Sequence, residues 1–361
     1  MWPYWLMFLV TAVAALSARR HRVHFATGLR SVKLDGAWVA AVLVLTLLIG
    51  FRFEVGTDWL PYVNRVYNAR YAPFTTIFAW GDPGYRLLNW ISAQMDWGIY
   101  GVTLIGGAIF SSGLAVFCRS LPRPWLALAV AVPFLVIAVA MGLNRQAIAL
   151  GLAMLGLVAL GRRQTHWFVI WVVFAAAFHK SAVILLPIAA LAATRNRYWT
   201  ALWVGVVALG TYMLLLEDSV DLLISNYVGE TKKHESQGAM IRLLMNAVPA
   251  AILLLWRRRF EFTETEAILW RWFAIISLAL LGLLLVFQDT AAVDRVALYL
   301  LPLQLVVFAH LPDVFGNRGR LNEVLKVAVL FYYAVVQFVW LNYARHANDW
   351  LPYQFYPLEA W

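Results

Sequence analysis

A succession of long apolar stretches constrains the fold of this chain more than any other feature. A transmembrane helix needs about 20 apolar residues, with roughly 17 to 25 as the usual range. Of the 361 residues, 63% are hydrophobic and 13% charged, which is more apolar surface than a water-soluble core of this size could bury. The sequence therefore predicts an all-α polytopic integral membrane protein with about 12 transmembrane helices. The expected helices are 2–17, 36–52, 98–118, 125–141, 147–161, 167–178, 181–193, 199–216, 242–256, 267–287, 296–310 and 324–342.

The stretch 167–193 has two interpretations: one long helix with His179 and Lys180 at its middle, or two short helices that meet at His179. With two short helices, more than half of the 29 lysines and arginines lie in short loops on one side of the membrane. That side is then cytoplasmic by the positive-inside rule. A single helix would send Arg257 and Arg258 outside. We therefore expect two short helices and both chain termini on the extracytoplasmic side.

The net charge of +10 raises the question of a nucleic-acid partner. The basic residues form short clusters between apolar stretches and never a continuous stripe, so we expect anionic lipid headgroups as their partners and no nucleic acid. The single cysteine, Cys118, can form neither an intramolecular disulfide nor a cysteine metal cage. Without an internal repeat or a soluble domain boundary, the chain is expected to be one transmembrane domain over residues 1–361.

Polar residues concentrate on the expected outer side. Residues 53–97 and 217–241 form two extracytoplasmic loops. Helical spacing within the first loop predicts two interfacial helices lying along the membrane surface. Their apolar faces are expected to contain Trp59, Tyr62, Val63, Val66 and Tyr67 in one helix, and Leu87, Leu88, Ile91 and Met95 in the other.

Charged residues at the outer ends of membrane helices are costly to keep there, which makes them candidates for function. Several arginines around one cavity suit a diphosphate, because guanidinium is permanently charged and binds phosphate oxygens as a fork. We find no D-x-D pair and no metal-ligand spacing, so arginines and not a metal ion are expected to stabilise the leaving group. The candidates are Arg52, Glu54, Asp58, Arg145, His179, Lys180, Arg242, Asp289, Asp294 and Arg295.

Several of these residues also have a purely structural interpretation. Asp58 could cap the interfacial helix that follows it. Asp294 and Arg295 could pair with other charges at helix ends, and His179 with Lys180 could simply terminate two short helices. Arg65 is expected to be a solvated loop charge.

At these positions the sequence resembles the EpsG family of exopolysaccharide polymerases, which belongs with the Wzy-type polymerases. Five stretches carry the resemblance in order: FRFEVGTDWLPYVNRVY, WGDPGYRLLNWI, NRQAIALGLAML, FAAAFHKSAVILLPI and DRVALYLLPLQ. Together they span most of residues 51–305. The resemblance implies a GT-C-like polymerase that joins oligosaccharide repeat units carried on polyprenyl diphosphate. It carries over to Arg52, Gly56, Asp58, Asp82, Arg145, Gln146, His179 and Arg295, with Asp82 standing where the family pattern has glutamate.

The expected reaction is glycosyl transfer, in which an acceptor sugar hydroxyl attacks the anomeric carbon of the donor chain and polyprenyl diphosphate departs. Arg145 and Arg295 would hold the diphosphate with Arg52 in support, and Asp58 or His179 would take the hydroxyl proton. The other residues expected to bind substrate are Glu54, Asp82, Gln146, Lys180, Arg242, Asp289, Asp294 and Tyr299.

Three other functions stay open: a glycan ligase, an acyltransferase with His179 as its base, and a flippase of lipid-linked oligosaccharide. An acyltransferase would need a cytoplasmic donor, and a flippase would have inverted repeats with polar residues toward both faces. The expected partners are the lipid-linked oligosaccharide, the growing glycan, membrane lipid and a chain-length regulator, with no cofactor. The expected location is the bacterial inner membrane, with the active site facing the periplasm or exterior.

Overall fold

The protein is helical over nearly all the residues that its computed structural model describes. Within them, the strands form one short pair, β1 (Arg52–Phe53) with β2 (Gln354–Phe355). Six of the described helices are long and apolar enough to cross a membrane, and five shorter apolar helices accompany them. The protein is therefore an all-α polytopic membrane protein, while the count of about 12 spans stays a prediction. The described residues are 1–18, 34–78, 81–192, 197–215, 239–286, 291–316 and 322–359.

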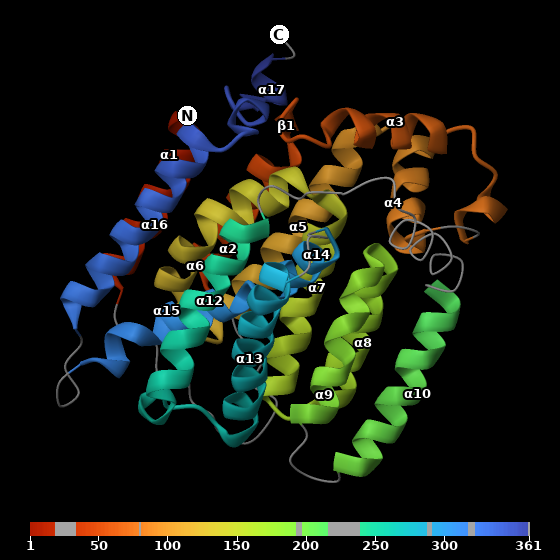
Figure 1. Ribbon diagram of the computed structural model, residues 1–361. Helices are drawn as coiled ribbons and strands as arrows, with labels where there is room; N and C mark the ends of the chain where they lie inside the picture. The colour runs from red at the N-terminus through yellow and green to blue at the C-terminus, as the bar shows by residue number, and fades with distance from the viewer. Residues whose placement is uncertain are drawn as a thin grey trace.

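Each apolar range expected to span the membrane coincides with one helix or two consecutive helices, over the residues described (Figure 1). The range 296–310 is split at Leu301, because Pro302 lacks the N–H that would continue the helix. The helices are α1 (Trp2–Ser17), α2 (Gly36–Gly50), α5 (Gly98–Arg119), α6 (Pro124–Ala131) with a π-helical continuation (Val132–Ala140), α7 (Asn144–Gly161), α8 (Thr165–Phe178), α9 (Leu186–Ala192), α10 (Arg197–Leu215), α12 (Ala239–Trp256), α13 (Glu264–Val286), α14 (Ala291–Leu300), α15 (Pro302–Val314) and α16 (Glu323–Tyr343).

The ambiguous stretch 167–193 consists of two short helical segments. α8 ends at Phe178, and His179 has an extended backbone with φ −154° and ψ 109°. A 3-10 helix, η3 (Lys180–Leu185), then leads directly into α9. The expectation of two segments that meet at His179 is confirmed.

The two ends of the bundle differ in chemistry. At the end opposite the termini, Arg123 forms a two-pronged ion pair with Asp313, with both N···O distances 2.9 Å. Arg163 pairs with Glu264 at 3.3 Å nearby. That this end is cytoplasmic stays a prediction from the positive-inside rule. Residues 19–33, 193–196 and 317–321 of the expected cytoplasmic loops lie outside the described residues.

The first outer loop contains α3 (Trp59–Ala69) and α4 (Pro83–Gln94), so the two predicted loop helices exist. α3 lies across the end of the bundle where both termini lie (Figure 1), and it buries Trp59, Tyr62 and Val66 while Tyr67 is exposed. On α4, Ile91 and Met95 are exposed as well.

α4 instead buries Tyr85, Leu88, Asn89, Ser92 and Ala93. Packing is close on this face, because a Cβ at Gly84 would come 3.0 Å from the Ala177 carbonyl oxygen of α8. Small and polar side chains commonly make such helix contacts in membrane proteins, where apolar residues gain little by leaving lipid. The position of both helices along the membrane surface stays a prediction.

Residues 344–359, hereafter the C-terminal segment, are tied to the first outer loop. Arg52 of β1 is opposite Phe355 of β2 in an antiparallel pair. The Gly56 N–H donates to the Asp349 carbonyl at 2.7 Å, and the Tyr353 hydroxyl donates to the Leu48 carbonyl at 2.7 Å.

The same segment is anchored to the bundle. The Tyr4 hydroxyl of α1 donates to the Trp350 carbonyl at 2.8 Å, and the Trp350 indole donates to the Ile137 carbonyl at 2.8 Å. The C-terminal segment therefore holds the first outer loop and is itself held by α1, so residues from both ends of the described chain support this loop.

α7 is fixed to α5 by a contact between two glycines. A Cβ at Gly113 of α5 would come within 2.1 Å of the Gly151 carbonyl oxygen of α7, so a larger residue would force the helices apart. Small residues allow such backbone approach in membranes. α7 begins with the candidate residues Arg145 and Gln146, so this packing fixes their position.

Candidate active site

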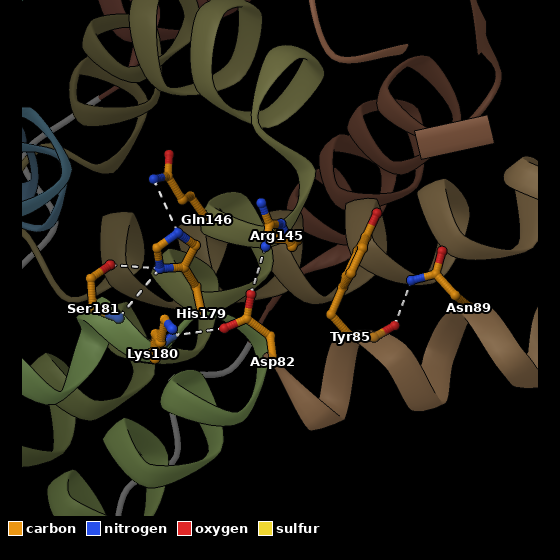
Figure 2. A network of polar contacts seen from close by, with 8 residues as sticks. All are labelled: Asp82, Tyr85, Asn89, Arg145, Gln146, His179, Lys180 and Ser181. Atoms are coloured by element: carbon orange, nitrogen blue, oxygen red, sulfur yellow. Dashed lines mark hydrogen bonds and ion pairs between the residues drawn. The ribbon is translucent and has the colours of Figure 1, made fainter. Parts of the chain in front are cut away.

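Asp82 joins three elements at the outer end of the bundle (Figure 2). Its carboxylate is at the N-terminus of α4 and is 6% exposed. One oxygen accepts from an Arg145 terminal nitrogen of α7 at 2.8 Å, and the other accepts from the Lys180 backbone N–H at 3.1 Å. Asp82 thus holds the start of α7 against the junction that follows α8. Figure 1 shows α8 ending well short of α3, so this junction lies beneath the outer loop.

His179 stands at that junction with both ring nitrogens in contact with polar groups. Nδ1 is 2.5 Å from the Ser181 hydroxyl oxygen, and Nε2 is 3.2 Å from the Gln146 amide nitrogen (Figure 2). His179 is the C-cap residue of α8, just past the apolar helix Thr165–Phe178, and burial lowers its pKa to about 4. Arg145 lowers the pKa further, whereas Asp82 raises it. The imidazole is therefore neutral near pH 7 and able to accept a proton.

The contacts around His179 also indicate its tautomer. The Ser181 backbone N–H donates to Nδ1 at 3.4 Å, which places the ring hydrogen on Nε2. A Nε2 hydrogen needs an acceptor, and the Gln146 side-chain oxygen is buried without a hydrogen bond. A half-turn of the Gln146 amide would bring that oxygen to Nε2 and satisfy both groups.

α14 contributes Arg295 and Tyr299, which lie one helical turn apart and therefore on one face. Tyr299 is 1% exposed, with its hydroxyl beside Ser181. Arg295 is exposed, acts electrostatically on both His179 and Lys180, and forms no ion pair with any residue that the structure describes.

Arg145 uses one terminal nitrogen for Asp82, while its Nε is buried without a hydrogen bond. Its side chain is 34% exposed. Unsatisfied donors on a permanently charged, partly open guanidinium are what a phosphate oxygen would bind. Arg145 and Arg295 therefore both bring positive charge near a neutral imidazole.

Arg52 is buried more deeply than Arg145 and is only 1% exposed. It donates to the Ile49 carbonyl at 2.5 Å and lies 5.8 Å from the centre of the Trp59 ring. Burial lowers its pKa to about 10, and nearby tyrosines, Tyr62 first among them, oppose that shift. Arg52 does not reach the surface of the site here, so its direct contact with a diphosphate stays a prediction.

Two tyrosines, Tyr62 and Tyr85, lie near both Arg52 and Arg145 and act on them electrostatically. The Tyr62 and Tyr85 ring centres are 6.0 Å apart, and the Asn144 amide donates to the Tyr85 hydroxyl at 3.4 Å. Both arginines act on Tyr62 electrostatically. These tyrosines therefore link the first outer loop to the start of α7.

Asp58 occupies the N-cap position of α3, but its carboxylate makes no capping hydrogen bond, so that structural interpretation is wrong. The side chain is partly exposed and acts on Tyr62, as Arg145 does. Gly56 has φ +100°, and a Cβ there would meet the Met141 carbonyl oxygen at 2.7 Å. The Asp58 loop is thus pressed against the residues that precede α7.

The remaining candidates differ in how far they join this site. Arg242 is half-buried near the start of α12, which packs on α14 through the Asn246 amide bonded to the Ala297 carbonyl at 2.9 Å. Glu54 is exposed on the outer loop. Asp289, the Asp294 side chain and residues 217–238 of the second predicted loop lie outside what the structure describes.

Sequence reasoning missed Ser181, Tyr62, Tyr85 and Asn144 as site residues. Ser181 and Asn144 are adjacent to residues that were selected, so the only sequence signal was proximity. Tyr62 was expected on the apolar face of its helix, and its side chain is buried on that face. Arginine side chains nevertheless lie close to its hydroxyl. No three His, Cys, Asp or Glu side chains gather as a metal-binding group among the described residues.

These observations define a polytopic helical membrane protein with a cationic, histidine-containing site at the end of the bundle where its termini lie. The model of the EpsG family matches residues 37–355, which is most of the chain. The chain belongs to the EpsG family, as its sequence motifs predict, and this places it among membrane proteins of exopolysaccharide biosynthesis. No curated protein and no solved structure matches the chain.

Proposed function

We propose that the protein is a polysaccharide polymerase that transfers a growing glycan from polyprenyl diphosphate onto a lipid-linked repeat unit. The observation that carries this proposal is the gathering of Arg145 and Arg295 near neutral His179, on which both act electrostatically. Two guanidinium groups match a departing diphosphate, and a neutral imidazole matches a proton that must leave an attacking hydroxyl.

The arginines would act on the leaving group. As the bond from the anomeric carbon to the diphosphate oxygen breaks, its electron pair adds negative charge to that oxygen. Arg145 has donors to spare and Arg295 forms no ion pair with the described residues, so both can turn toward that charge. Fixed cations aimed at developing charge lower the barrier without reorganising.

His179 would act on the nucleophile. The acceptor hydroxyl would displace the Ser181 hydroxyl from Nδ1, the ring nitrogen that carries no hydrogen, give its proton to Nδ1 and bond to the anomeric carbon through its oxygen. Gln146, in contact with Nε2, would hold the ring in position, in the way a second group orients a catalytic base. Asp58 is the second candidate base, because its carboxylate is partly exposed on the loop over α7.

The site would face the periplasm or exterior of the bacterial inner membrane. The ion-paired opposite end and the excess of basic residues in its loops support that orientation. The substrate partners would be the lipid-linked oligosaccharide and the growing glycan. A chain-length regulator stays a prediction from the family.

Incubating purified protein with lipid-linked repeat units and resolving the products by gel tests this function. A ladder of products is expected, whereas a single transfer to a different acceptor would indicate a ligase. Acyl transfer from a supplied acyl donor would indicate an acyltransferase. Unchanged lipid in solution, together with movement of that lipid across liposome membranes, would indicate a flippase.

Because arginines would supply the positive charge, ladder formation should persist when EDTA is present throughout the assay. Loss of the ladder in EDTA, with recovery on adding magnesium or manganese, would show that a divalent ion does what is assigned here to Arg145 and Arg295.

A further inference from the structure

Six aromatic side chains meet where the first outer loop and the C-terminal segment join. The Tyr100 and Tyr356 rings stack with centres 4.0 Å apart, and Trp59 lies 6.1 Å from Tyr100. Tyr356 is 38% exposed. We call this group the outer aromatic cluster, and its members are Phe51, Phe53, Trp59, Tyr100, Phe355 and Tyr356.

An exposed carboxylate stands beside the cluster. Glu54 acts electrostatically on the Tyr100 hydroxyl. Its backbone has φ +51°, in the left-handed region that non-glycine residues seldom adopt. Such a conformation is retained only where the surroundings impose it, and it is common at binding sites.

Resting on the proposed function, we propose that the outer aromatic cluster with Glu54 is a binding subsite for the growing glycan. A pyranose ring has one face made of C–H groups, which packs on the electron-rich face of an aromatic ring. Its hydroxyls need acceptors at the ring edge, and a carboxylate supplies strong ones. Exposed Tyr356 and Glu54, both close to Tyr100, offer these two features within one group.

The position of the cluster supports a glycan over a lipid as its occupant. β1, β2 and α17 (Tyr356–Glu359) follow the outer ends of α2 and α16, so they lie beyond the spanning helices (Figure 1). An unpaired carboxylate would also disfavour anionic headgroups. Glu54 forms no ion pair with any residue in the described ranges.

The cluster is continuous with the proposed active site. Trp59 follows Asp58 in sequence and lies over the Arg52 guanidinium at 5.8 Å. Arg52 in turn faces the two tyrosines behind Arg145. A glycan bound at the cluster would therefore lie near the site where its own end reacts, and holding it there would favour repeated additions over release.

The test uses the purified full chain with lipid-linked repeat units, comparing Tyr356→Ala and Glu54→Gln with two matched controls at the same end. Trp2→Ala removes an exposed interfacial aromatic outside the cluster, and Glu359→Gln neutralises an exposed carboxylate outside it. Three quantities are measured: the rate of the first coupling in a single turnover, the product length distribution, and inhibition by delipidated glycan.

The cluster variants should make markedly shorter products, because their later additions should slow more than their first coupling does. Inhibition by delipidated glycan should weaken about tenfold in Glu54→Gln, the loss expected for one hydrogen bond to a charged group. Both controls should match the wild type.

Unchanged product lengths and inhibition in Tyr356→Ala and Glu54→Gln would overturn the subsite. The same would follow if Trp2→Ala shortened products equally, since the aromatics would then act only as membrane anchors. If the wild type forms no ladder at all, the polymerase function fails instead. Calorimetric binding of delipidated glycan, lost in the two cluster variants, would then decide the subsite by itself.

Discussion

Asp82 shows how one residue can be essential to a site without reacting. Both of its oxygens accept hydrogen bonds from other elements, one from Arg145 and one from the Lys180 backbone, and it is almost fully buried. A carboxylate held by two other elements and 6% exposed is poorly placed to take a proton from a substrate. The structure therefore favours a positioning role for Asp82.

Many of the individual site residues could be predicted from the sequence, for a physical reason. Isolated charges at helix ends, such as Arg145 and His179, stand out against apolar neighbours because lipid tolerates few of them. The burial of Arg52 was not accessible, since it depends on Tyr62 and Tyr85 folding over it from a loop. Sequence patterns also gave no reason to separate Asp82 as a structural anchor from Asp58 as a free carboxylate.

Lysine should fail to replace the two site arginines. Arg145→Lys and Arg295→Lys keep the charge but lose the planar fork, and the loss should appear in the chemical step because the leaving-group charge develops there. One lost donor at a developing anion typically costs about 2.7 to 4 kcal/mol, roughly a hundred- to a thousandfold in rate. Single-turnover rates of folded, inserted variants measure this.

The matched control for these variants is Arg70→Lys. Arg70 forms an exposed ion pair with Asp96 at 3.0 Å, and such pairs contribute little. Arg65, expected from sequence to be a simple solvated charge, lies 5.4 Å from the Tyr62 ring and is a poorer control. Near-normal polymer from both site variants would leave Arg145 and Arg295 as ordinary interfacial charges.

The pH dependence should identify the base. A neutral His179 with a pKa near 4 stays active as pH rises and loses activity only as pH falls through that pKa, so kcat/KM should be flat from pH 5 to 8. Bound diphosphate places negative charge nearby and favours imidazolium, so the acidic limb of kcat should move to higher pH than that of kcat/KM.

His179→Gln should abolish transfer, while Asp58→Asn should retain the acidic limb. The reverse pattern, with Asp58→Asn inactive and His179→Gln active, would assign the base to Asp58.

At the scale of elements, hydrophobic patterning located the helices but not how they contact one another. α14 and α15 were expected as one helix because the apolar run continues through Pro302. On α4, Gly84 and Ser92 pack inward while Ile91 stays exposed, and this pattern depends on the neighbouring helices, which the sequence does not specify. The break at His179 was predicted, since loop charges required it.

The glycine contact between α5 and α7 should be intolerant of any side chain. Gly113→Val would drive a branched side chain into the Gly151 backbone, separate the helices and displace Arg145 at the start of α7. Overpacking of this kind costs typically about 1–3 kcal/mol, occasionally more. Thermal unfolding in detergent should show the loss.

Gly205→Ala on α10, where an added Cβ meets nothing within 4 Å, is the control and should unfold like the wild type. Equal stability of Gly113→Val and Gly205→Ala would mean that the two helices are not packed this closely.

At the scale of the whole molecule, the C-terminal segment completes the first outer loop. Removing residues 344–361 should leave the helical bundle inserted in the membrane, because the bundle would lose only the contacts that this segment makes with it. Activity should fall to background, because β1 loses its partner strand and Gly56 its bond to Asp349. Protease mapping and ladder assays on the truncated protein would show the two effects separately.

Deleting only residues 360 and 361, which follow the segment, is the matched control and should leave the ladder intact. Full activity of the protein truncated after residue 343 would show that the first outer loop keeps its structure without the C-terminal segment.

The pairing of these distant segments also sets an order of events during biosynthesis. Leu48 and Tyr353 are 305 residues apart, and a ribosome adds about 5–20 residues per second, so on the order of 15 to 60 s separate their synthesis. In the proposed orientation, the first outer loop crosses the membrane during that interval without its partner strand. A nascent chain would then carry Arg52, Gly56 and Asp58 outside the cell's interior in an unfinished arrangement. The proposed sugar coupling would therefore begin only after translation has passed residue 355 and α16 has been inserted.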